Sequence, residues 1–223
     1  HNETSTGVIN DLVALSKIYK KYPESYVIVD AVSSLGGYKI EVDALGIDVL
    51  VSATQKALGL PPGLAIMSVS DKAVQRLQQD KPRGYYLDLK RVYEKHVKNF
   101  QYPTTPNLSL MMALEYQLNY IVNIEGLEHR FQRHTMLAEY VRTWAKKHYA
   151  LFAPEGFQSQ TVTTIINTKN KSTHVLSEAL FKKGYVMSDG YGSLKGKVIR
   201  IPHMGDLTLE VLKDYVKEIE SLW

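Results

Sequence analysis

The chain contains no cysteine, and this absence excludes several kinds of chemistry. Without cysteine there is no disulfide, no thiolate ligand for a metal ion and no cysteine nucleophile. A protein without disulfides fits a reducing compartment, so we expect it in the cytoplasm. No apolar run approaches the roughly 18 residues that a membrane-spanning helix requires, so we expect no membrane partner.

Charge of one sign is not concentrated anywhere in the chain. The 27 lysines and arginines and the 23 acidic residues are interspersed and leave a net charge of +4. Nucleic-acid-binding proteins commonly carry basic clusters with interleaved aromatic residues, and no such block occurs here. The histidines do not have the spacing of metal ligands. We therefore predict neither a nucleic-acid partner nor a metal site.

The first half of the chain alternates between helical and strand patterns. Residues 8–21 have apolar positions at helical spacing, whereas residues 26–30, 47–52 and 64–69 are short apolar runs typical of buried strands. This alternation predicts an α/β domain with a mostly parallel sheet.

The pattern changes after residue 107. Residues 107–126 and 127–150 predict two long helices that are separated at Gly126. The remainder predicts a strand at 161–167, a helix at 172–183, short strands near 185–188 and 197–201, and a closing helix at 207–222. We interpret this part as a small α+β unit and place the domain boundary near residue 124.

Two charged residues follow neighbouring strand patterns. Asp30 ends one apolar run, and Lys56 lies just beyond the end of the next. Ligands of open α/β sheets bind outside the carboxyl ends of the strands, so these side chains could face one crevice. The strand pattern alone favours a simpler interpretation, in which Asp30 caps a turn and Lys56 is solvated. Pyridoxal phosphate would use both groups, a lysine for covalent attachment and an acid beside its pyridine nitrogen.

Six motifs that occur in order along the chain favour the interpretation as a pyridoxal-phosphate site. They are HNETSTG (1–7), VDAVSSLGG (29–37), SATQKALGLPPG (52–63), YLDLKR (86–91), YPTTPN (102–107) and GKVIRIPHMGD (196–206). Together they resemble the class V aminotransferases of pyridoxal-phosphate fold type I, especially the alanine–glyoxylate and serine–pyruvate aminotransferase branch. The resemblance implies that residues 1–124 are the C-terminal portion of the large cofactor-binding domain. Residues 125–223 would then be the small C-terminal α+β domain.

The resemblance also implies roles for single residues. Lys56 would form the Schiff base with the cofactor and carry the proton from the substrate α-carbon. Asp30 would pair with the pyridinium nitrogen, and Val32 would pack against the ring, although it could equally be an ordinary core valine. Gln55 would add polar contacts beside the lysine. Thr4 would bond the ring hydroxyl; taken alone, its Ser/Thr cluster is more often a helix cap.

Two further positions imply an assembly. Tyr102 and Thr105 match positions that reach the cofactor phosphate of a neighbouring subunit, which implies a homodimer with shared active sites. Without the companion motifs, Tyr102 would be an unremarkable exposed loop residue.

Arg200 lies within an apolar strand pattern, where an unpaired charge is costly to bury. One interpretation is a buried salt bridge inside the small domain. The other is a planar fork that holds the α-carboxylate of the substrate, and the resemblance favours this second interpretation. His203 lies nearby, and we assign it no role.

The chain also departs from the family. Relatives carry a segment before HNETSTG that supplies a glycine-containing phosphate loop and an aromatic ring that stacks on the cofactor, and we find neither here. We expect either a fragment or a second polypeptide that provides this half, and so an incomplete active site in this chain alone. Cysteine desulfurases share the fold but place a histidine before the lysine and use a mobile cysteine, so their chemistry is excluded here.

The sequence therefore predicts a pyridoxal-phosphate-dependent aminotransferase. It would transfer an amino group between a small amino acid (alanine or serine) and a small 2-oxo acid (glyoxylate or pyruvate) by a ping-pong mechanism. One alternative is another fold-type-I reaction, such as that of an aminoethylphosphonate transaminase or a lyase. Another alternative is a non-catalytic partner half of a split enzyme.

Overall fold

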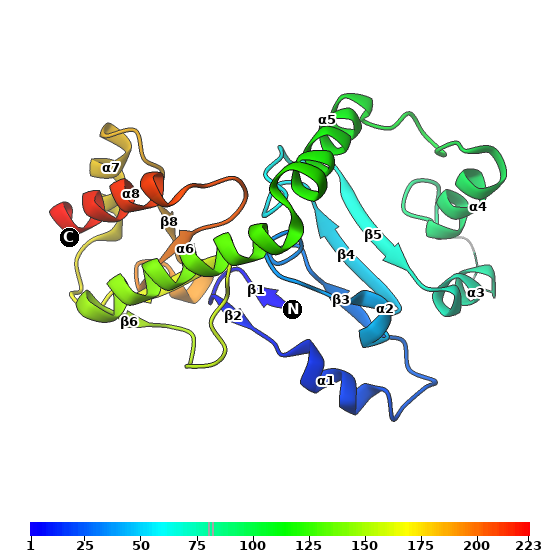
Figure 1. The fold of residues 1–223 in the computed structure, drawn as a ribbon, viewed down its shortest axis with the longest axis horizontal. Helices are drawn as coiled ribbons and strands as arrows, with labels where there is room; N and C mark the ends of the chain where they lie inside the picture. The colour runs from blue at the N-terminus through cyan, green and yellow to red at the C-terminus, as the bar shows by residue number, and fades with distance from the viewer. Residues whose placement is uncertain (80, 82) are drawn as a thin grey trace.

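The computed structural model describes residues 1–79, 81 and 83–223. The first half is built around a three-stranded sheet of β3 (Ile28–Asp30), β4 (Val49–Ala53) and β5 (Ala65–Val69), in that order (Figure 1). β3 pairs with β4 in parallel, whereas β4 and β5 are antiparallel. The predicted α/β fold is confirmed, and within this chain the sheet is mixed, with one parallel and one antiparallel pairing. Residues 54–64, which join β4 and β5, are too few for the helical crossover that a parallel pair needs.

The helix predicted for residues 8–21 is shorter than expected. Its first residues instead form β2 (Val8–Ile9), which pairs with β1 (Asn2–Glu3). Helix α1 (Leu12–Tyr19) begins only after Asp11, because the Asp11 carboxylate accepts a hydrogen bond from the Ala14 amide at 2.9 Å and caps the helix.

The other helices of this half lie around the sheet. They are α2 (Val42–Leu45), α3 (Asp71–Gln79) and α4 (Leu89–Asn99). One hydrophobic cluster forms where α1 meets the sheet, and its buried members are Leu12, Val29, Ala31, Ile47 and Leu50.

A long helical segment connects the two halves of the molecule (Figure 1). Helix α5 (Leu108–Asn119) continues into the π-helical turn η1 (Tyr120–Glu125), and α6 (Leu127–His148) follows. The predicted break is confirmed at Gly126, whose φ of 81° lies in the left-handed region that favours glycine.

The second half contains a four-stranded antiparallel sheet. Its order is β6 (Ala150–Leu151), β7 (Val162–Ile166), β9 (Val198–Pro202) and β8 (Ser188–Asp189). Helices α7 (Thr173–Lys182) and α8 (Leu209–Leu222) complete it, and the short 3-10 turn η2 (Gly192–Leu194) lies between β8 and β9. The strand and helix predictions for this half are confirmed to within a few residues.

A second hydrophobic cluster lies in this half, with α6 packed on the antiparallel sheet. Leu137, Val141, Ile165 and Ile199 are among its buried members. The two clusters fall on either side of residue 124, but the domain boundary itself stays a prediction.

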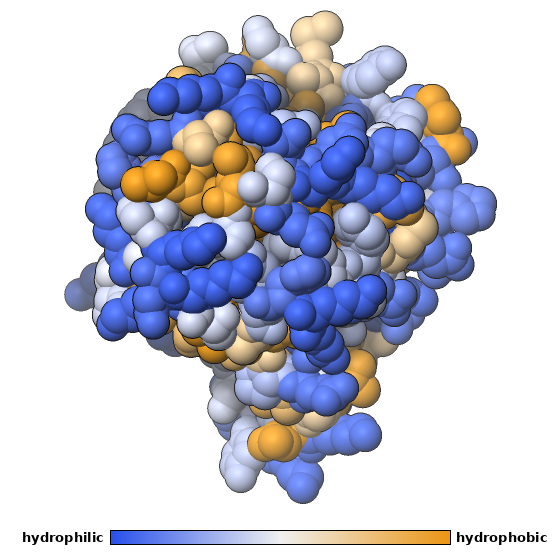
Figure 2. Space-filling view, turned by 90° about the vertical axis from the view of Figure 1, so that its left-hand side faces the viewer, coloured by the Kyte–Doolittle hydropathy of each residue, from blue (hydrophilic) through white to orange (hydrophobic). Residues whose placement is uncertain are grey.

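The end of the molecule that carries α7 and α8 has a mostly hydrophilic surface. Figure 2 shows this end, where hydrophobic side chains form only small separate groups. Among the residues that the structure describes, no helix is both long and apolar enough to cross a membrane.

Candidate active site

Lys56 lies in a tightly bonded loop between β4 and β5. The Gly59 amide donates to the Lys56 carbonyl at 2.9 Å, and the Leu60 amide donates to the Thr54 carbonyl at 3.1 Å. The loop turns at Gly59, whose φ is 75°. These bonds hold Lys56 just beyond the end of β4, the position that the strand pattern predicts.

Two hydroxyl groups contact the amine of Lys56. Its Nζ atom donates to Thr4 Oγ1 at 3.1 Å and to Ser33 Oγ at 3.3 Å, and the two hydroxyls also hydrogen-bond to each other. Burial lowers the pKa of Lys56, and the positive charge of Arg200 lowers it further, against the opposing influence of Tyr191 and other groups. A lower pKa increases the fraction of neutral amine, which is the form that accepts a proton.

Asp30 is the last residue of β3, the strand that pairs with the lysine-bearing strand β4. It pairs in register with Val51 of the parallel strand β4, so both strands end at the same edge of the sheet. Its Oδ1 atom accepts a hydrogen bond from the Val32 amide at 2.9 Å, so the carboxylate does cap the following turn. The side chain is nevertheless exposed, and its negative charge raises the pKa of Lys56. The same carboxylate can therefore cap the turn and meet a ligand.

Arg200 lies in β9, and only 5% of the residue is exposed. Its Nε atom donates to the Asp189 carbonyl at 2.8 Å, and its guanidinium lies 3.8 Å from the centre of the Tyr191 ring. Within the part of the chain that the structure describes, no carboxylate forms an ion pair with it. Arg200 therefore lacks the carboxylate partner that a salt bridge within the small domain would require. Its charge is available to an anionic ligand.

Lys56 and Arg200 line one open cavity between the two halves of the molecule. Its volume is about 550 Å³, within the range of small-molecule sites. Thr4 and Gln55 line the same cavity on the lysine side. The side near Arg200 is largely apolar or aromatic and includes Tyr185, Val186, Tyr191, Met204, Leu207, Val211, Leu212 and Tyr215.

The structure does not bring every predicted residue to this cavity. Neither Asp30 nor Val32 is part of the lining; Asp30 is exposed and Val32 is half-buried. Tyr102 and Thr105 are exposed on the segment between α4 and α5, away from the cavity, where the Tyr102 ring lies 6.1 Å from that of His96. Their contact with a partner subunit stays a prediction.

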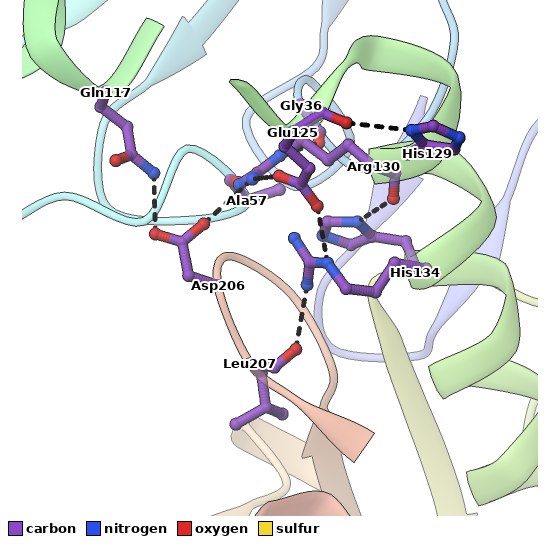
Figure 3. A network of polar contacts seen from close by, with 10 residues as sticks. Gly36, Ala57, Gln117, Glu125, His129, Arg130, His134, Asp206 and Leu207 are labelled. Carbon is purple, nitrogen blue, oxygen red and sulfur yellow. Dashed lines mark hydrogen bonds and ion pairs between the residues drawn. The ribbon is translucent and has the colours of Figure 1, made fainter. Parts of the chain in front are cut away.

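A fully buried arginine, Arg130, organises the loops around the cavity (Figure 3). Its Nε donates to the Gly36 carbonyl at 2.9 Å, and its Nη2 donates to the Ala57 carbonyl at 2.6 Å. Its Nη1 pairs with Glu125 at 2.6 Å and with Asp206 at 2.9 Å. One side chain thus joins the loop after Asp30, the lysine loop and the loop after β9.

Neighbouring polar groups complete this network (Figure 3). Arg133 bonds Glu125 at 2.7 Å and the Leu207 carbonyl at 2.9 Å, and Gln117 donates to Asp206 at 2.8 Å. Burial opposes ionisation of Glu125, but the hydrogen bonds from Arg133 and Arg130 outweigh it and lower the pKa of the carboxyl.

Two buried histidines lie near this network. Burial lowers the pKa of His203 to about 3 and that of His134 to about 4, so both are neutral at pH 7. His203 shares a 2.8 Å hydrogen bond with Thr163. In the described ranges, no group of histidine and acidic residues could hold a metal ion.

Sequence reasoning missed three of these residues. Ser33 stood inside a motif but had no assigned role, and Tyr191 and Arg130 lay outside the motifs or in a helix. No local pattern marks them: Arg130 reaches Gly36 across 94 positions, and Ser33 contacts the Lys56 amine 23 positions away.

The side chains around the cavity fit pyridoxal phosphate. A half-buried lysine with a lowered pKa suits covalent attachment, and the exposed carboxylate of Asp30 lies within electrostatic reach of that amine. The hydroxyls of Thr4 and Ser33 supply neutral polar contacts beside it.

Comparison with known proteins agrees with this geometry. Residues 1–201 match the family described as aminotransferase class-V. Members of this family depend on pyridoxal phosphate.

Two curated relatives and one solved structure illustrate the likeness. The chain is 39% identical to a protein of Anabaena cylindrica named soluble hydrogenase 42 kDa subunit, covering 92% of this chain and 53% of the relative. It is 33% identical to the L-aspartate–glyoxylate aminotransferase of Paracoccus denitrificans, and the match covers 93% of this chain and 53% of that relative. A crystal structure of alanine–glyoxylate aminotransferase from Nostoc sp. superimposes with a TM-score of 0.91 at 28% identity, covering 100% of this chain and 60% of that one.

The chain therefore spans about half the length of the curated relatives that it matches. The family match, the fold and the placement of Lys56 at the strand end lead to one conclusion. This chain belongs to the class V aminotransferases.

Proposed function

We propose that the protein catalyses pyridoxal-phosphate-dependent transamination between alanine or serine and a small 2-oxo acid, glyoxylate or pyruvate. One observation carries this proposal: the amine of Lys56 and the guanidinium of Arg200, which has no carboxylate partner among the described residues, line the same cavity. A group that moves a proton and a group that binds a carboxylate are then present on two sides of one site.

Three residues of this chain would hold the cofactor. Lys56 would attach it covalently through its amine, Asp30 would keep its pyridine nitrogen protonated, and Thr4 would bond its ring hydroxyl. When bound, pyridoxal phosphate supplies an electron sink for the electron pair that remains on the substrate α-carbon.

Once the incoming amino acid has freed its amine, Lys56 Nζ would also be the base that takes the substrate α-proton and passes it to the cofactor. Burial favours its neutral form, and the hydroxyls of Thr4 and Ser33 fix the position of Nζ. Because a serine or threonine hydroxyl both donates and accepts hydrogen bonds, these two residues can bind the amine in its neutral and its charged form.

Arg200 would bind the α-carboxylate of each substrate in turn. Asp189 fixes its Nε edge, which leaves the terminal nitrogens for a two-point contact with a carboxylate. One arginine would serve both the amino donor and the oxo acid, so the two half-reactions follow one another at one site, as a ping-pong mechanism requires.

The cavity lining favours a small neutral side chain on the substrate. Among its described lining residues, the cations are Lys56 and Arg200, and both already have a role. A second carboxylate, as in aspartate, would find no further cation there and would meet a largely apolar wall. Alanine and serine avoid this cost. The similar protein from Nostoc sp. is named an alanine–glyoxylate aminotransferase, which supports the choice of alanine and glyoxylate.

We also propose the organisation in which this site operates. The protein would form a homodimer in the cytoplasm, with Tyr102 and Thr105 at the cofactor phosphate of the partner. Residues 1–124 would belong to the cofactor-binding domain and residues 125–223 to the small domain. The exposure of Tyr102 and Thr105 and the two separate hydrophobic clusters support this organisation.

The visible spectrum of the complete protein or complex that contains this chain, purified with pyridoxal phosphate, tests the function. We expect the absorption band of the bound cofactor to change when L-alanine or L-serine is added, and glyoxylate to reverse the change with formation of glycine. A lyase would instead release its product without any oxo acid. A spectrum that neither amino acid alters would contradict the proposal.

A further inference from the structure

Tyr191 occupies an unusual place at the rim of the cavity. The residue is 61% exposed, yet its ring covers one face of the Arg200 guanidinium, with 3.8 Å between the guanidinium carbon and the ring centre. Hydrogen bonding from Arg200 and the charge of Arg200 lower the pKa of the phenol, and the charge of Lys56 lowers it as well. The ring is therefore close to both cations of the site.

The turn that carries Tyr191 is fixed by hydrogen bonds. Asp189 Oδ1 accepts from the amides of Gly190 at 2.6 Å and Gly196 at 3.0 Å, while Oδ2 accepts from Thr173 at 3.0 Å. A Cβ atom at Gly190 would collide with the Leu194 carbonyl, so the turn closes this tightly only with glycine.

Asp189 also positions the arginine. Its backbone carbonyl accepts the hydrogen bond from Arg200 Nε, so one residue fixes both the turn below Tyr191 and the edge of the guanidinium. Asp189 therefore keeps the backbone beside Tyr191 and the Arg200 guanidinium close together, which favours the stacking of the two side chains.

The chemistry of a guanidinium explains what this stacking can do. Its N–H groups point outward in its plane, and a carboxylate binds in that plane. A ring on one face leaves the plane open but stabilises the orientation of the cation by roughly 0.5–2 kcal/mol, a two- to thirtyfold effect on an equilibrium constant. Because Tyr191 also lines the cavity, the same ring would take up space beside a carboxylate bound to Arg200.

We propose that Tyr191 is a specificity-determining residue of this site: its ring holds Arg200 in the orientation that binds a carboxylate and limits the size of the substrate side chain. The inference rests on the proposed transaminase function and adds to it a residue that selects among amino acids. It assigns the effect to the ring and not to the hydroxyl group.

Two substitutions separate ring from hydroxyl. Tyr191→Phe keeps the stacking and loses the hydroxyl, whereas Tyr191→Leu loses the stacking and opens space. Tyr22→Leu is a matched control, because Tyr22 is also 61% exposed and does not line the cavity. Since these side chains are exposed, the fold should survive all three substitutions, which thermal melting checks.

The first measurement uses calorimetric titration of the cofactor-loaded protein with L-lactate, which has the carboxylate but no amino group to transfer. We expect Tyr191→Leu to weaken lactate binding roughly three- to tenfold, and Tyr191→Phe and Tyr22→Leu to leave it within twofold. Equal affinity for the parent protein and Tyr191→Leu, or equal losses for the Phe and Leu variants, would overturn the inference.

The second measurement compares kcat/KM for L-alanine and L-leucine with glyoxylate as acceptor. In Tyr191→Leu the ratio of alanine to leucine should fall at least fivefold, through KM more than through kcat. An unchanged ratio in an active variant would overturn the size limit. If the parent protein itself transfers no amino group, the proposed function fails instead, and the lactate titration still decides whether Tyr191 supports the carboxylate site.

Discussion

Nη1 of Arg130 lies 2.9 Å from Oδ1 of Asp206, and this ion pair joins helix α6 to the loop that follows the Arg200 strand. The same arginine is bonded to the carbonyl of Ala57, the neighbour of Lys56. The distance between the proposed base and the proposed carboxylate-binding residue is thus set partly by one buried side chain.

Removal of Arg130 should be costly. Arg130→Met leaves two carbonyls without a donor and deprives Glu125 of one of its two cations. We expect a loss of about 3–5 kcal/mol in the free energy of unfolding, measured by urea denaturation. Asp206→Asn should cost less than about 1 kcal/mol, because the Asp206 side chain is 47% exposed.

Lys39 offers the matched control for that series. Its ion pair with Glu41 is 3.5 Å long and exposed on both sides, so Lys39→Met should change the unfolding free energy by only a few tenths of a kcal/mol. A loss for Arg130→Met no larger than this control would show that the buried network contributes little to stability.

Substitution of Arg200 should affect both substrates. Arg200→Lys keeps the charge but loses the planar fork, so the KM for the amino acid and the KM for the oxo acid should rise together, by about tenfold or more. Steady-state kinetics with each substrate varied in turn measures this. Amines that lack a carboxylate should be much less affected; equal damage to both classes would instead indicate a structural role.

Asp30→Asn tests the acid at the end of β3. The amide keeps the shape and can still accept the hydrogen bond from the Val32 amide, but it has no negative charge. We expect the amino-transfer rate to fall at least a hundredfold, about 3 kcal/mol of transition-state stabilisation, in stopped-flow measurements. Activity within a few fold of the parent would leave Asp30 as a turn cap only, and Asp11→Asn, which alters a helix cap distant from the cavity, is the control.

The buried histidines should make the protein less stable in acid. Burial lowers the pKa of His203 in the folded protein to about 3, whereas an unfolded histidine titrates near 6.5. As the pH falls below about 6.5, the unfolded chain binds a proton that the folded state excludes, so stability decreases toward pH 3. For each such histidine the slope approaches about 1.4 kcal/mol per pH unit.

His203→Gln isolates this contribution. Glutamine retains a polar partner for Thr163 but does not titrate, so the slope of unfolding free energy between pH 5 and 6.5 should decrease toward that of the remaining groups. The measurement is urea denaturation at several pH values. An unchanged slope would mean that His203 is protonated in the folded protein.

Local sequence patterns predicted much of the fold because local interactions determine it. Ser172 caps α7 through the Val175 amide, and the β-branched run of β7 is buried on both faces, so both elements could be identified from a few residues. The start of α1 was mispredicted because a pairing with other residues overrides the local pattern there. Val8 and Ile9 fit a helix by periodicity, but they pair with residues 2–3.

The candidate site could be predicted only where a motif marked it. Lys56, Asp30 and Arg200 stand at strand ends or inside a strand, where a charge is unexpected, and the motifs around them carried the family resemblance. Arg130 resembles an ordinary charged helix residue, and apart from the nearby Glu125 its partners are 73 to 94 positions away. Tyr191 depends on the pairing of β8 with β9, which periodicity alone does not reveal.

Covalent attachment of the cofactor is the most direct test of the role proposed for Lys56. The protein is loaded with pyridoxal phosphate, reduced with borohydride and digested, and the peptides are mapped by mass spectrometry. We predict that the reduced cofactor is on Lys56, and that Lys56→Ala removes both the label and the turnover while the melting temperature changes little. A label on any other lysine, or full turnover by Lys56→Ala, would contradict it.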